Sequence, residues 1–339
     1  MKVLFIGGNG NISWYCVQES LQMEHEVWIL NRNATSKTRR DIQPEVHKLN
    51  GDIRNRNEIT NLLKNKTFDV VADFICYNKE HAELDIELFR DKTKQFIFIS
   101  SESVYKRESK NLPYQENCPQ NDPFSSCSYI AGKILAEQTF LKAYQTFRFP
   151  VTIVRPGYTY DTIVPVALGG NCFTAPNRFI HGKPVLIAGD GTNLWTFTHS
   201  SDFASAFVKL LGNRITIGEA FHITSDEWLT WNEMTHILLD TLNIKYPQYI
   251  HIPFQAVLHS KLAVNQKDML YQKMWHNIYD LSKIRQLIPD WKIKVPFKQG
   301  IKQTIDWLYE DKIRCRINTN LDELLEELTI KYKGQNYET

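Results

Sequence analysis

The stretch that decides the fold is residues 2–13, KVLFIGGNGNIS, in which a short apolar run leads through a cluster of glycines into a helical pattern. The apolar run predicts a buried strand over 2–6, and the apolar spacing that follows predicts a helix over 12–23. Glycines let the backbone turn tightly here and let a pyrophosphate approach the helix N-terminus, where free N–H groups and the helix dipole favour an anion. The unit therefore predicts a dinucleotide site, with a purely structural turn as the alternative.

The contacts expected for this dinucleotide lie in the turn and at the start of the helix: Gly7, Gly10, Asn11 and Ile12. Ser13 stands where a third glycine would allow close packing of helix and strand. Because serine is also small, this departure from the usual spacing is minor.

The rest of the first 160 residues repeats the alternation of apolar runs and helical patterns. Strands are expected over 26–30, 69–75, 95–100 and 151–154, and helices over 56–63 and 131–144. Strands that are continuously apolar and linked by helices predict a parallel sheet covered on both faces. We therefore expect an α/β protein with a Rossmann-type doubly wound parallel sheet.

After residue 156 the pattern becomes richer in turns, which predicts a smaller, mixed C-terminal lobe for the substrate. Its expected elements include a helix over 202–211, a strand over 220–224 and a helix over 232–242. The expected boundaries are 1–165 for the dinucleotide domain, with 197–225 returning to it, 166–196 and 226–330 for the substrate lobe, and 331–339 for a frayed tail.

The end of the second strand bears on which dinucleotide binds. An Asp or Glu there accepts hydrogen bonds from the adenosine ribose of NAD and repels the 2′-phosphate of NADP. This chain has Asn31 and Arg32 instead, which favours NADP over NAD, although Arg32 also fits a solvated loop residue. Asp52 and Ile53 follow a further short strand, where Asp52 is expected either to accept from the adenine amino group or to form a turn.

Two Tyr-x-x-x-Lys pairs occur, Tyr129/Lys133 and Tyr279/Lys283, and in a helix this spacing places a phenol and an ammonium on one face. The ammonium favours the phenolate, which helps a phenol of ordinary pKa about 10 to act as a base near neutral pH. Tyr129 opens a predicted helix 28 residues after Ser101, which ends a strand, where open α/β sheets bind ligands. Tyr279 has no strand-end partner in the sequence, so we interpret the first pair as catalytic and the second as coincidence.

Further motifs follow in order along the chain. They are G-x-x-G at 7–10, Gly-Asp at 51–52, SSESVY at 100–105, P-x-x-E-x-x-P at 113–119, Y-x-x-x-K-x-x-x-E at 129–137, Arg-Pro-Gly at 155–157, Gly-Asp-Gly at 189–191, H-x-x-D at 199–202 and D-x-S-K at 280–283. With these motifs the chain resembles the extended short-chain dehydrogenases/reductases, the nucleotide-sugar epimerase and dehydratase group, over residues 1–310. The resemblance implies Ser101 as the hydroxyl that steadies the substrate oxygen, Tyr129 as acid/base and Lys133 as ribose ligand.

Three departures from the family pattern bear on the reaction, and one of them is residues 73–77, DFICY, at the strand end that lines the nicotinamide pocket, where the family usually has smaller, Ala-rich residues. Sugar 4,6-dehydratases carry Thr-Asp-Glu before the Val-Tyr pair, and here the matching residues are Ser101, Glu102 and Ser103, so dehydration is not expected. After Gly-Asp-Gly the family commonly has an Arg that grips the substrate diphosphate. This chain has Trp195, and an indole cannot replace a bidentate phosphate clamp.

The candidates for substrate contact are therefore Tyr77, Glu102, Trp195 and Arg178. Trp195 is expected either to stack on a sugar or base or to belong to the core. Tyr77 is expected either to reach the substrate or to cap its strand. Arg178 or Lys183 would supply the missing charge from another direction, and without it we expect weak binding of ordinary nucleotide hexoses.

Composition excludes several classes of protein. The 339 residues carry 40 Lys+Arg against 38 Asp+Glu, and a net charge of +2 argues against nucleic acid as a partner. No apolar run approaches the roughly 20 residues of a bilayer span, and the apolar run at 3–6 is too short for that of a signal peptide, so we expect neither a signal peptide nor a membrane partner. Six scattered cysteines argue against a disulfide framework or a zinc site. We expect a cytoplasmic protein without a metal, and a homodimer stays open.

These residues predict an NAD(P)-dependent epimerase or keto-reductase that acts on a sugar or sugar-like alcohol, nucleotide-activated or not. The alternative is a non-catalytic dinucleotide-binding regulator or an RNA-associated scaffold of the same fold. The complete set of Ser101, Tyr129 and Lys133 argues against this alternative, because a non-catalytic module does not need all three.

Overall fold

The computed structural model describes residues 1–32, 39–124, 126–264 and 267–334. The chain forms two compact units. The first unit comprises Met1–Thr159, Thr198–Asp226 and Tyr279–Lys294, and the second unit comprises Tyr160–Phe197, Glu227–Ile278 and Val295–Thr339.

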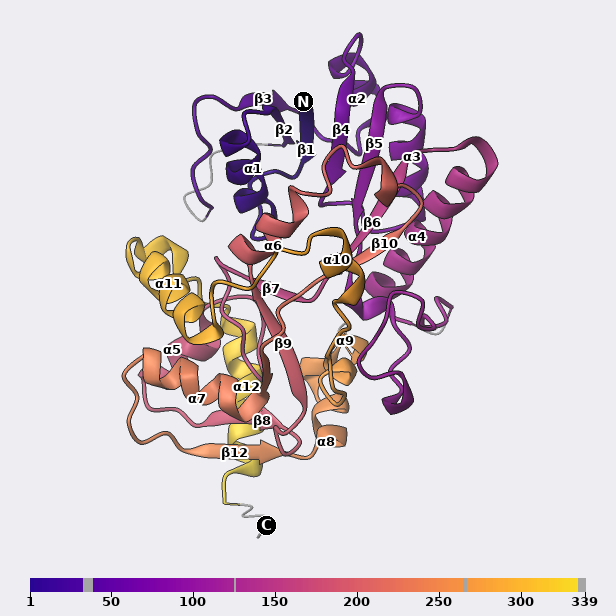
Figure 1. Cartoon of the computed structure of the whole chain (residues 1–339). Helices are drawn as coiled ribbons and strands as arrows, with labels where there is room; N and C mark the ends of the chain where they lie inside the picture. The colour runs from indigo at the N-terminus through magenta and orange to yellow at the C-terminus, as the bar shows by residue number, and fades with distance from the viewer. Residues whose placement is uncertain (33–38, 125, 265–266, 335–339) are drawn as a thin grey trace. The chain divides into compact units, whose positions relative to one another are not determined.

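A seven-stranded sheet forms the centre of the first unit (Figure 1). In spatial order its strands are β10 (Ala220–Ile223), β6 (Val151–Pro156), β5 (Thr93–Ile99), β4 (Phe68–Asp73), β1 (Lys2–Ile6), β2 (Glu26–Asn31) and β3 (His47–Asn50). All neighbours pair in parallel, which confirms the predicted doubly wound α/β fold. The order reverses between β1 and β4, and open sheets bind ligands at the carboxyl ends of the strands on either side of such a reversal.

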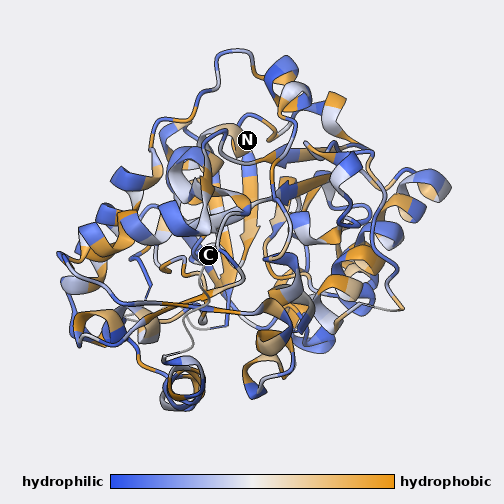
Figure 2. Ribbon diagram, turned by 90° about the horizontal axis from the view of Figure 1, so that it is seen from below, coloured by the Kyte–Doolittle hydropathy of each residue, from blue (hydrophilic) through white to orange (hydrophobic). Residues whose placement is uncertain are grey.

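Alternate residues of each strand pack into two separate cores, one on each face of the sheet. Val3 and Phe5 of β1 belong to one core, and Leu4 and Ile6 belong to the other. The first core is closed by α1 (Ser13–Gln22), α6 (Ser200–Phe207) and α10 (Ser282–Leu287), and the second by α2 (Arg56–Leu62), α3 (Lys79–Phe89) and α4 (Ser128–Phe147). Figure 2 shows the sheet strands as mostly hydrophobic and the surrounding helices as mixed.

The second unit contains smaller sheets, as the mixed lobe predicted from the sequence requires. One sheet has the order β11 (Trp228–Thr230), β9 (Leu194–His199) and β7 (Tyr158–Tyr160), with β11 and β9 antiparallel. In the other, β12 (Tyr249–Ile252) pairs in parallel with β8 (Val185–Ala188). The helices are α5 (Thr174–Ile180), α7 (Trp231–Thr241), α8 (Phe254–Leu258), α9 (Lys267–Gln272), α11 (Phe297–Tyr309) and α12 (Thr319–Tyr332).

Segment 279–294 was predicted to belong to the substrate lobe, and the structure assigns it to the other unit. It belongs to the first unit, because Leu281, Ile284 and Trp291 are buried in the core of the sheet face that α6 covers. At the C-terminus, α12 continues to Tyr332 and so extends into the predicted tail, of which 335–339 lie outside the described residues. Among the described helices, none has the length and apolar character that a membrane span requires.

Candidate active site

The glycine turn between β1 and α1 has a conformation that requires glycine. Gly7 has a φ of +80°, which side chains rarely tolerate, and a Cβ there would lie 2.8 Å from Cγ2 of Ile75. Ser13 braces the turn, because its Oγ accepts from the Gly10 N–H at 2.8 Å and donates to the Gly7 carbonyl at 2.6 Å. Serine at the third-glycine position therefore holds the turn in place with its hydroxyl.

The N-terminus of α1 presents donors that fit an anion. Ile12 occupies the N-cap position and makes no side-chain cap, so no capping side chain competes for the first N–H groups of the helix. Arg39 adds a guanidinium beside the turn, where its Nη1 donates to Asn9 Oδ1 at 2.8 Å. The Asn11 side chain donates to the carbonyl of Thr159, in the same unit, at 2.9 Å. A dinucleotide pyrophosphate fits this donor set.

The end of β2 carries the residues expected at the adenosine ribose. Asn31 is buried, and its Nδ2 has no acceptor among the described residues, so it is a donor suited to a polar ligand. Arg32 is largely exposed, and its Nη1 lies 4.0 Å from Oδ2 of Asp52. Asp52 also accepts from the Arg54 N–H at 2.9 Å, which supports the turn-forming role weighed for it, and Ile53 is buried in the core.

Ser101, Tyr129 and Lys133 come together at the carboxyl ends of β4 and β5. The Lys133 Nζ donates to the Cys76 carbonyl after β4 and to the Ile99 carbonyl at the end of β5, each at 2.7 Å. Tyr129 lies one turn earlier in α4, where its phenol is hydrogen-bonded to the Ser101 side chain. The Lys133 Nζ lies 6.0 Å from the centroid of the Tyr129 ring.

Burial dominates the protonation of this cluster. It raises the pKa of Tyr129 to about 12, against the opposing effect of the hydrogen bond with Ser101. It also lowers the pKa of Lys133 to about 8, against the opposing charge of Asp73. The charge of Lys133 alone predicted a lowered pKa for the phenol, and burial of the phenol reverses that direction. Tyr129 is therefore a phenol at neutral pH, a form suited to giving up a proton to a substrate oxygen.

Gly132 is a packing residue that the sequence analysis missed. A Cβ at Gly132 would lie 2.1 Å from the Tyr77 carbonyl oxygen, so α4 packs directly on the loop after β4. The Tyr77 side chain is 44% exposed, and its ring centroid lies 4.9 Å from the Lys133 Nζ. The glycine inside the Tyr-x-x-x-Lys motif was the only signal of this close approach.

Glu102 is buried, and one oxygen of its carboxylate has two partners. Its carboxylate accepts from Arg107 and, at 3.0 Å, from the hydroxyl of Tyr279. Tyr279 therefore contacts a residue that follows the end of β5, although the sequence predicted no strand-end partner for it. Its Lys283 lies apart from this contact and pairs with Glu219 at 2.7 Å.

Other motif residues form a buried structural network. Arg155 donates twice to Glu137, at 2.9 and 2.6 Å, and once to the Tyr105 hydroxyl, at 2.6 Å. The Tyr105 hydroxyl also lies 2.5 Å from Nε2 of His222, whose pKa burial lowers to about 3. His222 is therefore a neutral core histidine.

Trp195 belongs to the core of the second unit. It is 4% exposed, its indole N–H donates to the Trp275 carbonyl at 3.0 Å, and its ring centroid lies 4.8 Å from that of Trp231. Of the two roles considered from the sequence, the structure favours the core.

Arg178 does not supply the missing cationic contact. It is 4% exposed and donates to Asp322 at 2.7 Å and to Glu326 at 2.8 Å, both in α12. Lys183 also pairs with Glu326, at 3.1 Å. The expectation that either residue replaces the phosphate-gripping Arg is not supported, because carboxylates distant in sequence neutralise both.

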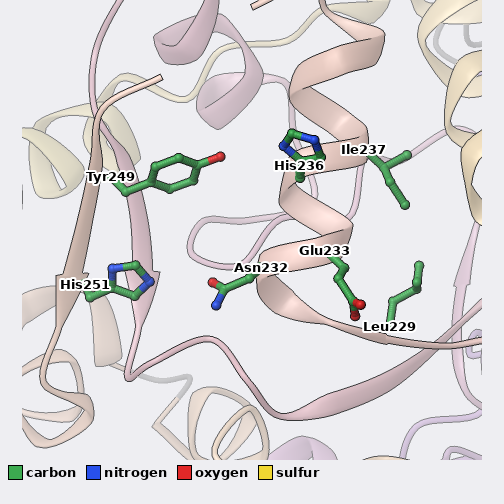
Figure 3. A pocket seen from close by; sticks show the side chains of 7 residues that line it. All are labelled: Leu229, Asn232, Glu233, His236, Ile237, Tyr249 and His251. Atoms are coloured by element: carbon green, nitrogen blue, oxygen red, sulfur yellow. The ribbon is translucent and has the colours of Figure 1, made fainter. Parts of the chain in front are cut away.

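A pocket of about 560 Å³ lies in the second unit between α7 and β12 (Figure 3). Its lining combines an apolar surface with a few polar groups: Leu229, Asn232, Glu233, His236, Ile237, Tyr249 and His251. None of the residues expected at the active site lines this pocket.

Comparisons with known proteins agree with this geometry. A family model described as "NAD dependent epimerase/dehydratase family" matches residues 3–224. The chloroplast stem-loop binding protein of 41 kDa b from Arabidopsis thaliana is 24% identical over 264 residues, which cover 74% of this chain and 65% of that protein. The UDP-N-acetyl-alpha-D-glucosaminuronate decarboxylase of Bacillus cytotoxicus is 24% identical over 332 residues, 91% of this chain and 98% of that protein.

Among solved structures, the UDP-glucuronic acid 4-epimerase from Bacillus cereus, in complex with UDP-glucuronic acid and NAD, matches with a TM-score of 0.70. It is 20% identical and the match covers 91% of this chain and 99% of that one, a likeness that shows the shared fold. The family model covers well over half of the chain and includes the glycine turn, Ser101, Tyr129 and Lys133. The chain belongs to the NAD-dependent epimerase/dehydratase family.

Proposed function

We propose that this protein is an NAD(P)-dependent epimerase or keto-reductase that acts on a secondary alcohol of a sugar or a sugar-like molecule. The observation that carries the proposal is the cluster of Ser101, Tyr129 and Lys133 at the ends of β4 and β5. Such strand ends are where open α/β sheets bind their ligands. A phenol, a hydroxyl and an ammonium in one cluster provide proton transfer and oxygen binding in the same place.

Each residue of the cluster has a distinct role in the proposal. A nicotinamide dinucleotide, when bound, supplies hydride transfer. Tyr129 gives the proton to the substrate oxygen in reduction and takes it back in oxidation. Ser101 donates a hydrogen bond to that oxygen, and Lys133 holds the ribose with the one ammonium proton left after its two carbonyl bonds.

The proposed cofactor contacts are the glycine turn, the start of α1 and the end of β2. Asn31 and Arg32 favour NADP, because neither repels a 2′-phosphate. The epimerase from Bacillus cereus is described as a complex with NAD, which supports NAD as the other candidate.

Titration of both cofactors into wild-type protein and Arg32→Ala tests this choice. A charge-assisted contact to a 2′-phosphate contributes on the order of 1.5–3 kcal/mol, so the variant should lose roughly tenfold or more in NADP affinity and little in NAD affinity. Equal loss for both cofactors, or tighter NAD binding by the wild type, would refute the NADP preference.

Turnover with a substrate panel tests the function itself. The panel contains UDP-, GDP- and dTDP-hexoses beside unactivated amino and keto sugars, with products identified by NMR and nucleotide release checked on fresh protein. Trp195 is buried and Arg178 is neutralised, so neither is available to bind the diphosphate of a nucleotide sugar. The loss of one charge-assisted contact costs roughly 1.5–3 kcal/mol. We therefore expect nucleotide sugars to bind ten- to hundredfold more weakly than they would bind a relative that has the phosphate-gripping Arg. Micromolar binding of any nucleotide sugar would overturn that expectation while leaving the enzyme class intact.

A second candidate is a non-catalytic dinucleotide-binding regulator or RNA-associated scaffold. The name of the chloroplast stem-loop binding relative favours it, although this chain spans 65% of that protein. The two candidates differ in one measurement, since only the enzyme loses cofactor-dependent product formation in Tyr129→Phe.

A further inference from the structure

Two buried carboxylates and one partly buried guanidinium lie together at the end of β4. Arg54 donates from Nη2 to Asp73 at 2.8 Å and from Nη1 to Asp85 at 2.7 Å. Both Asp73, at the end of β4, and Asp85, on α3, have no exposed surface. None of these three residues has a part in the proposed reaction.

The charges in this cluster do not balance if both carboxylates are ionised. Among the described residues, Arg54 is then the one cation hydrogen-bonded to the two buried anions, because the nearby Lys133 ammonium donates to the Cys76 and Ile99 carbonyls. Burying a charge without a partner of its own is costly. Asp85 uses Oδ1 for Arg54, while its buried Oδ2 accepts from no donor among the described residues. Burial and the charge of Asp73 raise the pKa of Asp85 well above its ordinary value. A proton on Asp85 would also let this carboxyl donate a hydrogen bond to Asp73, which raises the pKa further.

The groups that face Asp85 come from several elements. Asp73 lies on β4, Arg54 precedes α2, and Cys76 lies in the loop after β4, where burial raises the pKa of its thiol and keeps it neutral. One atom from each of Asp73, Cys76 and Asp85 lies within 4.8 Å of the others, a spacing that a metal ion also needs. The guanidinium already binds both carboxylates, so we interpret the cluster as an ion-pair network.

The cluster also fixes the loop that holds Lys133. Asp73 accepts from the Ile75 N–H at 2.6 Å, and Arg54 donates to the Ile75 carbonyl at 3.1 Å. The next carbonyl along this loop, that of Cys76, accepts from the Lys133 ammonium. The placement of that carbonyl therefore depends on Arg54 and Asp73.

We propose that Asp85 carries a proton in the folded protein at neutral pH and donates it in a hydrogen bond to Asp73. Arg54, Asp73 and Asp85 then form an electrically neutral group. This group positions the Cys76 carbonyl for Lys133. The importance of this group for turnover rests on the proposed role of Lys133, whereas the proton on Asp85 does not. Arg54, Asp73 and Asp85 are positioning residues, because they act on the site through the loop.

The pH dependence of stability tests the proton directly. Between the ordinary pKa of an Asp, about 4, and the raised pKa of Asp85, the folded chain holds one more proton than the unfolded chain. The contribution of Asp85 to the free energy of unfolding is complete below pH 4 and declines as pH rises. In Asp85→Asn the residue does not titrate, so its contribution does not depend on pH. In urea unfolding of the full chain, the ratio of unfolding constants, wild type over Asp85→Asn, should rise about tenfold per pH unit from pH 5 to 7.

Asp69→Asn, on the strand that carries Asp73, is the matched control. Asp69 has its pKa lowered by Lys94, so it is ionised in both states above pH 5 and its variant should run parallel to the wild type. Parallel curves for wild type and Asp85→Asn would overturn the proposal. A measurement on wild-type protein guards against a variant that fails to fold: the infrared carbonyl band of a protonated carboxyl must be present at pH 7, and its absence also overturns the proposal.

The positioning role has its own readout. Asp73 supports the ammonium of Lys133 by its charge, so in Asp73→Asn the Lys133 side chain should titrate at a lower pH, followed by NMR of its Cε. Asp69→Asn should leave that titration unchanged. An unchanged titration in Asp73→Asn would refute the link to Lys133 and leave both the proton on Asp85 and the proposed function untouched.

Discussion

Two Tyr-x-x-x-Lys pairs in one chain have the same spacing and different structures. Tyr129 and Lys133 both lie in α4, so the helix places them on one face, and the ammonium reaches the strand-end carbonyls beside the phenol. Tyr279 instead precedes α10, with its hydroxyl on Glu102, and Lys283 pairs with Glu219 at the surface. The comparison teaches that spacing brings two side chains together only when one helix contains both.

Replacing each tyrosine gives the largest expected difference between the pairs. Tyr129→Phe should lower kcat by about 10²–10⁴-fold, the range of general acid–base catalysis, with cofactor affinity almost unchanged because only the phenol hydroxyl is lost. Tyr279→Phe is the matched control and should change kcat little. Similar rates in the two variants would remove the distinction between the pairs and point to another acid/base.

The two lysines should differ in cofactor binding. Lys133→Met removes a buried ammonium, and the loss of one charge-assisted contact of roughly 1.5–3 kcal/mol predicts ten- to hundredfold weaker dinucleotide binding by calorimetry. Because burial lowers the pKa of Lys133 to about 8, the ammonium is present below that pH, and wild-type affinity should fall as pH rises above it. Lys283→Met should keep both the affinity and its pH profile, and a matching loss in that variant would contradict the assignment.

The smallest effect is expected for the stability of the second pair. The Lys283–Glu219 contact is partly exposed on both sides, so Lys283→Met should cost at most about 1 kcal/mol in the free energy of unfolding. High salt should remove most of that difference. A larger loss of unfolding free energy that persists in salt would show that Lys283 acts through its packing on Phe221. The Lys283 Nζ lies 4.7 Å from the centroid of that ring.

The sequence was sufficient where the signal is local. The run 2–13 predicted the first strand, turn and helix because glycine conformation and apolar spacing are properties of neighbouring residues. The end of a strand and the following helix also brought Ser101 and Tyr129 together as expected. The neutralisation of Arg178 by α12 could not be predicted, since its partners lie 144 and 148 residues further along the chain. The spacing between Tyr129 and Lys133 also could not reveal how far burial lowers the pKa of Lys133.

The close approach of Gly132 to the Tyr77 carbonyl has a consequence for reading mutational scans of this protein. Any side chain at position 132 must push α4 away from the loop after β4, and α4 carries both Tyr129 and Lys133. A deep mutational scan should therefore score Gly132 as intolerant as the reacting residues, even towards alanine. Intolerance at this position measures the absence of room for a single methyl group, and the chemistry of the residue has no part in it.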